Sequence, residues 1–382
     1  MAAGISRALA GAFLFSCLAL PHAPAAASPP PLEIYGRLPG TEDVALSPDG
    51  TMLAIVGTQG DARALIVQKV DGGPIVRAGI GDLKLAGAAW AGNDYVIVFV
   101  HRTARLTIRA QREHEFIQAL VIGAKDGTVK PLFRDSQDYL SAVFGVYGFA
   151  RLDGRWFGYF GVVPTERSND GDTHGFFKQR FPDLYRVDLA TGQVGRVTHG
   201  SPDERSWVVG DKGEIVAESE YEPSSGAWKV FLPGSPGQPI ISGTTPFGFG
   251  LMGLSRTPGT VLVREGGQDG QIVELHLDTG RVENFLPSGR ATVLIHSPTT
   301  RLLLGAVLVD DNRTLMFDPV LERHYQGIAK AFRGDALRLD SASADLSRIV
   351  VHVQGKDTAG TWQLVDFKTG KADPIADDYP GI

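Results

Sequence analysis

The sequence is almost without cysteine. Its 382 residues include a single one, Cys17, which lies in an apolar N-terminal segment. A disulfide framework needs pairs of cysteines and a thiolate metal site needs several, so both are excluded for the rest of the chain. Stability must therefore come from an apolar core, for which a hydrophobic content of 43% is ordinary.

An excess of positive charge and a long apolar run are missing too. The chain has 37 Lys and Arg against 43 Asp and Glu, a formal net charge of -6, which argues against a nucleic-acid footprint. Beyond the N-terminal segment no stretch approaches the ~20 apolar residues that a transmembrane helix requires. We therefore expect neither a nucleic-acid partner nor a membrane span.

The motifs of hydrolytic and metal chemistry are also missing. The sequence holds no G-x-S-x-G, which sets a nucleophilic serine on a strained turn, and no H-E-x-x-H, which pairs two histidines on a helix. Asp310–Arg313 and Asn169–Asp172 have oxygens that suit calcium but lack the ligand spacing of a recognised loop. We predict no catalytic residue, no metal site and no cofactor.

The N-terminus has the pattern of an export signal. Arg7 precedes an uncharged apolar run from Ala8 to Leu20, and small residues follow at Ala25 and Ala27. Residues 1–27 are therefore predicted to be a signal peptide cleaved after Ala27, and the protein is expected to be periplasmic or secreted. A lipoprotein acylated at Cys17 is the less favoured alternative. Residues 28–40 are predicted to be a proline-rich linker.

Two patterns alternate along the rest of the chain. One is a short apolar strand, a polar turn and a longer apolar strand, as in VALSPDGTMLAIV from Val44 to Val56. The other is an alternating strand that runs into a Thr-Gly or Asp-Gly turn and a shorter strand, as in Asp183 to Thr198. Both are hairpin signals. The first pattern opens seven units of roughly 48 residues, within the range of repeats of ~40 to 50 residues that form propeller blades.

These repeats predict an all-β fold, a β-propeller of seven four-stranded blades over residues 41–382, with six or eight blades as alternatives. A sandwich or two stacked barrels is the competing interpretation, because any all-β chain carries regular turns. Those folds do not require the two patterns to alternate. One segment, Arg109 to Leu120, competes as a helix, but its second half fits better as the third strand of unit two. A polar insertion, Pro164 to Pro182, is expected on one rim of unit three, where a partner would bind.

One group of carboxylates is a candidate binding site. Glu218, Glu220 and Glu222 occupy alternate positions, which places them on one face of a strand. Like charges on one face must be solvated or meet a cation, for which the amine of a substrate is one candidate. An exposed blade rim is the simpler interpretation. We predict these three residues as a substrate or partner rim.

The stretches LEIYGRLPGTEDVALSPDGTMLAIV, LAGAAWAGNDYVIVFV and PDLYRVDLATGQVGRVT carry a family resemblance. They resemble the amino-terminal propeller of exported bacterial peptidases of the prolyl oligopeptidase and acylaminoacyl peptidase family. The first stretch also resembles the repeat of periplasmic TolB-like propellers. The peptidase resemblance implies a lid or filter that admits small peptides to an α/β-hydrolase domain. The sequence ends at Ile382, where that domain would be expected to begin. Because none of the family's catalytic motifs is present, no catalytic residue of the family can be transferred to this chain.

Two functional hypotheses follow. The chain is the non-catalytic access propeller of an exported serine peptidase, with the hydrolase domain missing or encoded separately, and is inactive alone. Alternatively, it is a freestanding periplasmic propeller that binds a protein or peptide partner. In either case the chain ends near Pro31 and Tyr379 are expected to lie close together, as the ends of a closed ring do, and a separate hydrolase would dock on the rim of units one and seven.

Overall fold

The computed structural model describes residues 33, 36–105, 113–134, 138–166, 176–235, 237–286, 290–310, 313–356 and 358–380. The chain divides into two compact units, Met1–Gly36 and Arg37–Ile382. The predicted signal peptide and most of the predicted linker lie outside the described residues. Every described strand belongs to the second unit.

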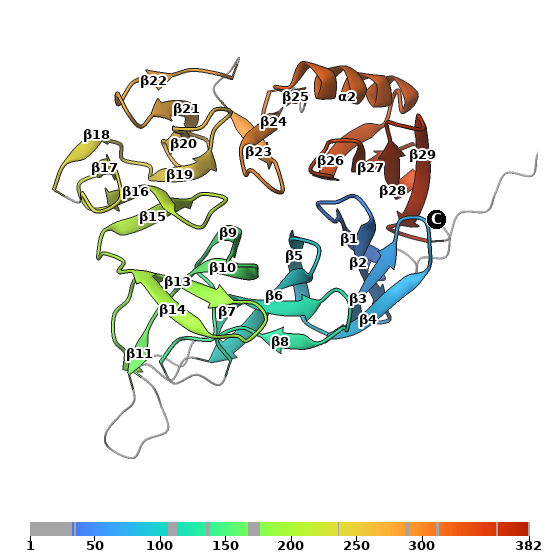
Figure 1. Ribbon diagram of the computed structural model, residues 1–382, viewed down its shortest axis with the longest axis horizontal. Coiled ribbons are helices and arrows are strands. Elements are labelled where there is room, and N and C mark those ends of the chain that lie inside the picture. The colour runs from blue at the N-terminus through green and yellow to red at the C-terminus, as the bar shows by residue number, and fades with distance from the viewer. Residues whose placement is uncertain are drawn as a thin grey trace, which may run out of the picture. The chain divides into compact units, whose positions relative to one another are not determined.

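The second unit is a ring of seven blades (Figure 1). Within the described residues, six blades are antiparallel sheets of four strands and blade 6 has three. In every blade the strands follow one another outward in chain order, so the first strand lines the centre of the ring. The predicted seven-bladed all-β propeller is confirmed, and a sandwich of two sheets is excluded.

The strands of blades 1 to 7 have equivalent positions. The inner strands are β1 (Thr41–Leu46), β5 (Lys84–Ala91), β9 (Gly145–Leu152), β15 (Glu204–Val209), β19 (Phe249–Leu254), β23 (Ala291–His296) and β26 (Ala336–Ala342). The second strands are β2 (Met52–Gln59), β6 (Tyr95–Arg105), β10 (Arg155–Val162), β16 (Ile215–Glu222), β20 (Thr260–Glu265), β24 (Leu303–Leu308) and β27 (Arg348–Gly355). The third strands are β3 (Ala62–Lys69), β7 (Glu113–Gly123), β13 (Asp183–Asp188), β17 (Ala227–Phe231), β21 (Gln271–His276), β25 (Thr314–Met316) and β28 (Thr358–Asp366). The outer strands are β4 (Pro74–Gly81), β8 (Val129–Pro131), β14 (Val194–Thr198), β18 (Pro239–Thr244), β22 (Val282–Glu283) and β29 (Lys371–Asp377).

The turn between the first two strands of blade 1 explains the opening pattern of the repeat. The Ser47 hydroxyl donates to Asp49 Oδ1 at 2.6 Å, and the same oxygen accepts the backbone N–H of Thr51 at 3.0 Å. Gly50 has a φ of +72°, which a residue with a side chain rarely adopts. Blade 7 repeats the arrangement, with Ser343 donating to Asp345 at 2.8 Å. The serine and the aspartate thus fix a tight turn that starts the hairpin.

Among the described residues the apolar core consists of seven clusters, one between each pair of neighbouring blades. Because side chains alternate along a strand, β6 sends Val96 and Val98 toward blade 1 and Ile97 toward blade 3, and all three are fully buried. The seventh cluster joins blade 7 to blade 1 through contacts that include Val350 and Leu46. Each blade is therefore held by apolar packing on both faces, and the last is packed against the first in the same way.

Hydrogen bonds add to that packing where the ring closes. The backbone N–H of Gly40 donates to the carbonyl of Asp378 at 2.6 Å, and that of Ala344 donates to the carbonyl of Pro48 at 2.7 Å. Leu46 N–H donates to the Ser341 hydroxyl at 2.9 Å. The expected proximity of the chain ends holds for Gly40 and Asp378. Pro31, which the prediction named, lies outside the described residues.

A helix occupies the outer position of blade 6. It is α2 (Pro319–Ala331), and Asp318 caps its N-terminus by accepting the N–H groups of Val320 and Leu321 at 2.9 and 2.8 Å. Its buried residues Leu321, Tyr325 and Ile328 pack on the cluster between blades 6 and 7. Figure 1 shows α2 on the outer rim, where it covers β25.

Blade 6 thus departs from the four-stranded pattern of the other blades, with three described strands and α2 in the outer position. Leu321, Tyr325 and Ile328 have a helical spacing that the search for paired strands overlooked. The interpretation of unit two was correct for the described part of Arg109 to Leu120, which belongs to β7. Residues 109–112 lie outside the described residues.

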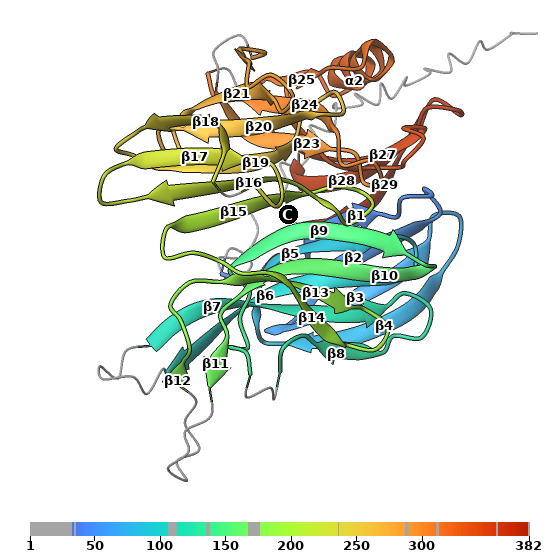
Figure 2. The same ribbon diagram turned by 60° about the vertical axis from the view of Figure 1, so that its left-hand side comes forward.

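The insertion predicted in unit three lies between β10 and β13. It contains a two-stranded hairpin of β11 (Thr165–Glu166) and β12 (Phe176–Phe177), and residues 167–175 between them lie outside the described residues. Figure 2 shows that this hairpin and one end of β7 project from the same side of the ring. The insertion therefore does extend from one rim, as expected.

Candidate functional site

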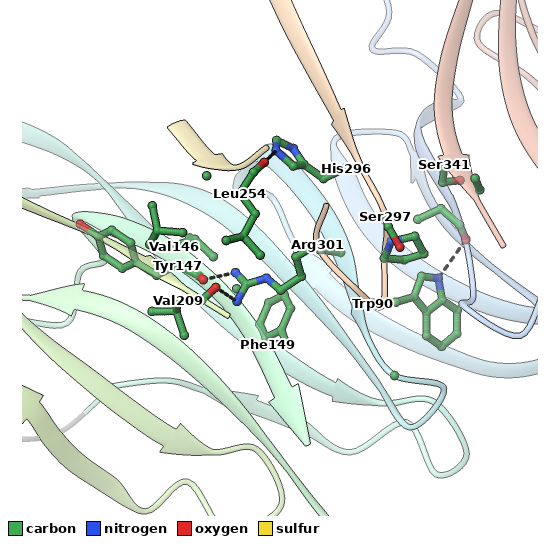
Figure 3. A pocket seen from close by; sticks show the side chains of 18 of the residues that line it. Trp90, Val146, Tyr147, Phe149, Val209, Leu254, His296, Ser297, Arg301 and Ser341 are labelled. Atoms are coloured by element: carbon green, nitrogen blue, oxygen red, sulfur yellow. Dashed lines mark hydrogen bonds between the residues drawn. The ribbon is translucent and has the colours of Figure 1, made fainter. Parts of the chain in front are cut away.

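All seven inner strands or the turns that follow them contribute to one cavity at the centre of the ring. Its volume is about 490 Å³. We call it the arginine cavity, after Arg301 (Figure 3). It is lined by Ala45, Leu46, Ala88, Ala89, Trp90, Gly92, Val146, Tyr147, Gly148, Phe149, Trp156, Trp207, Val208, Val209, Leu251, Met252, Gly253, Leu254, His296, Ser297, Pro298, Arg301, Asp340, Ser341 and Ala342. The fold thus concentrates side chains from the whole sequence in one place.

The inner strands are sheet edges, and side chains from neighbouring blades satisfy some of their backbone groups. Trp90 Nε1 in blade 2 donates to the carbonyl of Ala45 in blade 1 at 3.0 Å. His296 Nε2 in blade 6 donates to the carbonyl of Leu254 in blade 5 at 3.2 Å. Unpaired edge groups would otherwise be free to pair with another chain. These bonds therefore fix the positions of the lining side chains and leave fewer backbone groups to which a ligand could form hydrogen bonds.

Arg301 crosses the cavity from one side of the ring to the other. It follows the turn after β23 in blade 6, and its Nη1 donates to the carbonyls of Val209 at 2.5 Å and Gly210 at 3.1 Å in blade 4. Its Nη2 donates to the carbonyl of Tyr147 in blade 3. Figure 3 shows the guanidinium pointing toward Tyr147 and Val209. Burial lowers the pKa of Arg301.

The backbone on both sides is shaped to admit this arginine. Arg301 itself has a φ of +61°, a left-handed conformation that is costly for a side chain of its size. Gly148 on β9 has a φ of +104°, and a Cβ at this position would overlap the Arg301 guanidinium. Two unusual backbone conformations, about 150 residues apart in sequence, therefore serve one side chain.

Aromatic side chains form much of the remaining wall. Trp90, Tyr147, Phe149, Trp156 and Trp207 line the cavity from blades 2, 3 and 4. The rings of Tyr147 and Trp207 meet edge to face with centroids 5.3 Å apart, and burial raises the pKa of Tyr147 to about 12. Such walls offer large, rigid surfaces to an apolar or aromatic group of a ligand.

A second cavity, of about 550 Å³, lies beside blades 7, 1 and 2. We call it the carboxylate cavity. It is lined by Pro39, Thr41, Glu42, Asp43, Leu85, Ala86, Gly87, Arg338, His352, Gln354, Trp362 and Asp378. Since β1, β5 and β26 each contribute to both cavities, these three strands run from one to the other.

Two acidic residues of the carboxylate cavity, Asp43 and Asp378, accept hydrogen bonds from neighbouring residues. Burial raises the pKa of Asp43 to about 6, although its Oδ2 accepts the N–H of Ala88 at 2.8 Å. Asp378 accepts from His352 Nε2 at 2.8 Å and from Trp362 Nε1 at 2.7 Å. These bonds join strands of blade 7 to the segment that closes the ring.

Asp340 is an acidic residue of the arginine cavity that pairs with a residue of the carboxylate cavity. Asp340 lines the arginine cavity and pairs with Arg338, which lines the carboxylate cavity, at 2.6 Å. Burial raises the pKa of Asp340, and the charge of Asp378 raises it further. Its Oδ2 has no hydrogen-bond partner among the described residues. The charge of Asp340 is nevertheless compensated by the neighbouring guanidinium.

The predicted glutamates lie on one face of β16 in blade 4, but a cation is already among them. Arg205 of β15 pairs with Glu220 and lies 3.9 Å from Glu218. Glu222 is exposed and accepts the hydroxyls of Ser224 and Ser225. Their shared face was correctly inferred from the alternation. None of the three lines the arginine or the carboxylate cavity, and their role as a partner rim stays a prediction.

Sequence reasoning missed Arg301, because the sequence shows it as one residue of a polar turn. Its role depends on blades 3 and 4, which are distant in sequence. The register of the repeat could have located the cavity but not Arg301 itself, which lies beyond the end of β23. Once a ring is assumed, the last residues of each inner strand must converge on its centre. Val209, Leu254 and His296 all occupy that position.

Two absences hold for the part of the chain that the structure describes. No group of three or more His, Cys, Asp or Glu residues there could hold a metal ion. None of the helices in that part combines the length and the apolarity needed to cross a membrane.

The fold and the cavity define the class of the molecule, a β-propeller with a central cavity. No protein-family model matches the chain, and no curated protein matches it. Similar solved structures include prolyl oligopeptidase B from Galerina marginata, bound to a 35mer hydrolysis and macrocyclization substrate, with a TM-score of 0.51 and 10% identity over 89% of this chain. TolB from Acinetobacter baumannii aligns with a TM-score of 0.37 and 13% identity over 87% of this chain.

A prolyl endopeptidase, from a study of inter-domain dynamics in two such enzymes, aligns with a TM-score of 0.37 and 14% identity over 87% of this chain. The alignments cover 51% of the oligopeptidase chain, 65% of TolB and 40% of the endopeptidase. Identities this low show the propeller fold alone. Both peptidase propellers and a TolB propeller are thus among the structural neighbours.

Proposed function

We propose that this chain is a non-catalytic propeller that binds an extended segment of a peptide or protein in its arginine cavity. The observation that carries the proposal is the convergence of all seven blades on one cavity of about 490 Å³ with aromatic walls. Ligand sites combine concave walls with a few placed polar groups, and this cavity offers aromatic walls beside the guanidinium of Arg301.

We further propose that the chain is the access region of an exported serine peptidase of the prolyl oligopeptidase family. The sequence resemblance and the propeller of the Galerina marginata oligopeptidase, which was solved with a 35mer substrate, support this reading. A freestanding TolB-like propeller is the second candidate, supported by the repeat that resembles TolB. Both imply export, which rests on the N-terminal signal pattern.

Tryptophan fluorescence can test the binding proposal. Three of the five tryptophans, Trp90, Trp156 and Trp207, line the cavity, so a bound peptide should change their emission. Trp156→Phe should reduce the change, because it removes a reporter from the wall. Trp228→Phe, in blade 4 and outside the cavity lining, should leave the change intact. If pooled nine-residue peptides of random sequence produce no saturable change, the proposal is wrong.

Two further observations separate the readings. A reading frame downstream in the genome that encodes G-x-S-x-G supports the peptidase reading, and its absence supports the freestanding one. Labelling of the purified chain by a fluorophosphonate probe would contradict the non-catalytic part of the proposal, because the probe reacts with an activated serine.

A further inference from the structure

Arg301 is a largely buried cation whose described partners are all uncharged. Its hydrogen bonds go to the carbonyls of Tyr147, Val209 and Gly210. Asp211 and Glu214 attract it through space, but among the described residues neither forms an ion pair with it. A buried charge is costly unless it is paired, and among the described residues no carboxylate in contact with the guanidinium compensates Arg301.

The hydrogen-bonding capacity of Arg301 is also not exhausted. A guanidinium carries five N–H donors, and these three bonds leave the Nε donor and one on Nη2 without a described acceptor. Trp207, which is 2% exposed, lines the same cavity, and its Nε1 has no acceptor among the described residues. Arg301 thus brings two N–H donors without a described acceptor to the lining of the cavity, whereas the indole N–H of Trp207 is buried in the wall.

The other charged groups of the lining do not supply those acceptors. Asp340 pairs with Arg338 on its own strand. His296 donates to a backbone carbonyl, and burial lowers its pKa, so it adds a neutral ring to the wall. The backbone strain at Arg301 and the glycine at 148 show that the fold holds the guanidinium in this position at a cost.

From these contacts we infer that the arginine cavity binds a carboxylate, the free C-terminus of the bound peptide, through Arg301. The inference rests on the proposed peptide-binding function and names the group that is recognised. The two free N–H groups of a guanidinium match the two oxygens of a carboxylate. Two free N–H groups are few for a phosphate dianion, which has three acceptor oxygens. An Asp or Glu side chain within the peptide offers the same carboxylate chemistry and is the other source to be tested.

The test compares matched peptides on the full-length protein. Two pools of nine-residue peptides of identical random composition, one with free and one with amidated C-termini, are incubated with immobilised protein, and the bound fraction is quantified by mass spectrometry. We expect the free pool to bind at least about tenfold more tightly, because amidation removes the charge that strengthens the hydrogen bonds to the guanidinium. Arg301→Gln should remove the difference. Arg290→Gln, which changes an exposed arginine of the same blade, should preserve it.

Each outcome bears on the inference. Equal binding of the two pools overturns it while leaving peptide binding intact, and binding of neither pool overturns the proposed function as well. Enrichment of internal Asp or Glu, with no effect of amidation, moves the carboxylate from the C-terminus to a side chain and contradicts the inference as stated. Displacement of the bound peptides by inorganic phosphate, but not by acetate at the same concentration, contradicts it in favour of a phosphoryl anion. If Arg301→Gln does not fold, the two pools on the unaltered protein still decide.

Discussion

The two cavities differ in how their charges are compensated, although β1, β5 and β26 contribute to both. In the carboxylate cavity Asp378 is bonded to His352 and Trp362, and a guanidinium and a histidine lie among the acidic groups. In the arginine cavity the guanidinium has only neutral carbonyl partners among the described residues. The bonds that Asp378 accepts are expected to stabilise the ring, whereas the open N–H donors of Arg301 can bind a ligand. We therefore expect the carboxylate cavity to stabilise the ring, and the proposed recognition belongs to the arginine cavity.

The largest effect is expected where the backbone makes room for Arg301. Gly148→Ala should lower the free energy of unfolding by about 3 kcal/mol or more, since it combines left-handed strain with overlap of the guanidinium. Gly154→Ala is the matched control, because Gly154 has a φ of +78° but a Cβ added there would meet no heavy atom within 4 Å. Urea denaturation measures both. Equal losses in the two variants would show that the arginine can move aside without cost.

The next effect tests the compensated cavity. Asp378→Ala removes the acceptor of His352 and Trp362 where the ring closes, and should lower the free energy of unfolding by about 2 to 3 kcal/mol. Asp373→Ala changes an exposed carboxylate on β29 and should stay within about 0.5 kcal/mol of the unaltered protein. Thermal and urea unfolding provide the comparison. A loss no larger than that of Asp373→Ala would mean that these bonds do not stabilise the closure.

A pH dependence should distinguish the cavities further. The pKa of Asp43 is about 6 in the folded protein against about 3.9 in an unfolded chain, so the folded state binds more protons between these values. The contribution of Asp43 to stability is therefore full below about pH 4 and is lost as the pH rises through 6. By linkage, Asp43→Asn should gain about 2 kcal/mol relative to the unaltered protein between pH 4 and pH 7.

That gain is measured by urea unfolding of both proteins at pH 4 and pH 7. Subtracting the unaltered protein from the variant at each pH cancels the titration of groups that do not interact with Asp43, and Asp340, whose charge acts on Asp43, is not one of these. Asp373→Asn serves as the exposed control. If the stability difference between Asp43→Asn and the unaltered protein does not change with pH, the carboxyl is ionised without penalty and burial does not govern it.

The smallest effect concerns a neutral contact between the blades. Ser341→Ala leaves the N–H of Leu46 without its acceptor, and should lower the free energy of unfolding by about 1 kcal/mol. Ser235→Ala, in the loop before β18, is expected to be nearly neutral. Hydrogen exchange of the Leu46 amide offers a second readout, since its protection should fall in the first variant alone. Unchanged protection would contradict the role given to this bond.

The fold could be predicted from the sequence because its determinants are local and repeated. The serine, aspartate and glycine of the first turn specify a hairpin within five residues, and the pattern recurs with a nearly constant period. In blade 6 the local sequence signals change, and there the structure differs from the predicted four strands. Asp318 and Pro319 begin a helix in the place of a strand, and only the spacing of Leu321, Tyr325 and Ile328 marks it.

The candidate site could not be predicted in the same way. Glu218 and Glu220 were correctly placed on one face, because alternation along a strand is a local property. Their pairing with Arg205 depends on the register between β15 and β16, which the sequence does not show directly. Arg301 is further removed, because its partners lie in other blades. Contacts between residues of different blades, such as those of Arg301, can be identified only from the three-dimensional structure of the ring.

The seven apolar clusters close the molecule into a ring in which every pair of neighbouring blades is packed in an equivalent way. We call each of these packed junctions a joint. The joint between the last and first blades is the one that the polypeptide does not cross, and there the backbone of Gly40 already touches that of Asp378. A link between those two residues could replace any of the other six connections without dividing a cluster. The order in which the gene encodes the blades is thus one of seven cyclic orders that would build the same ring.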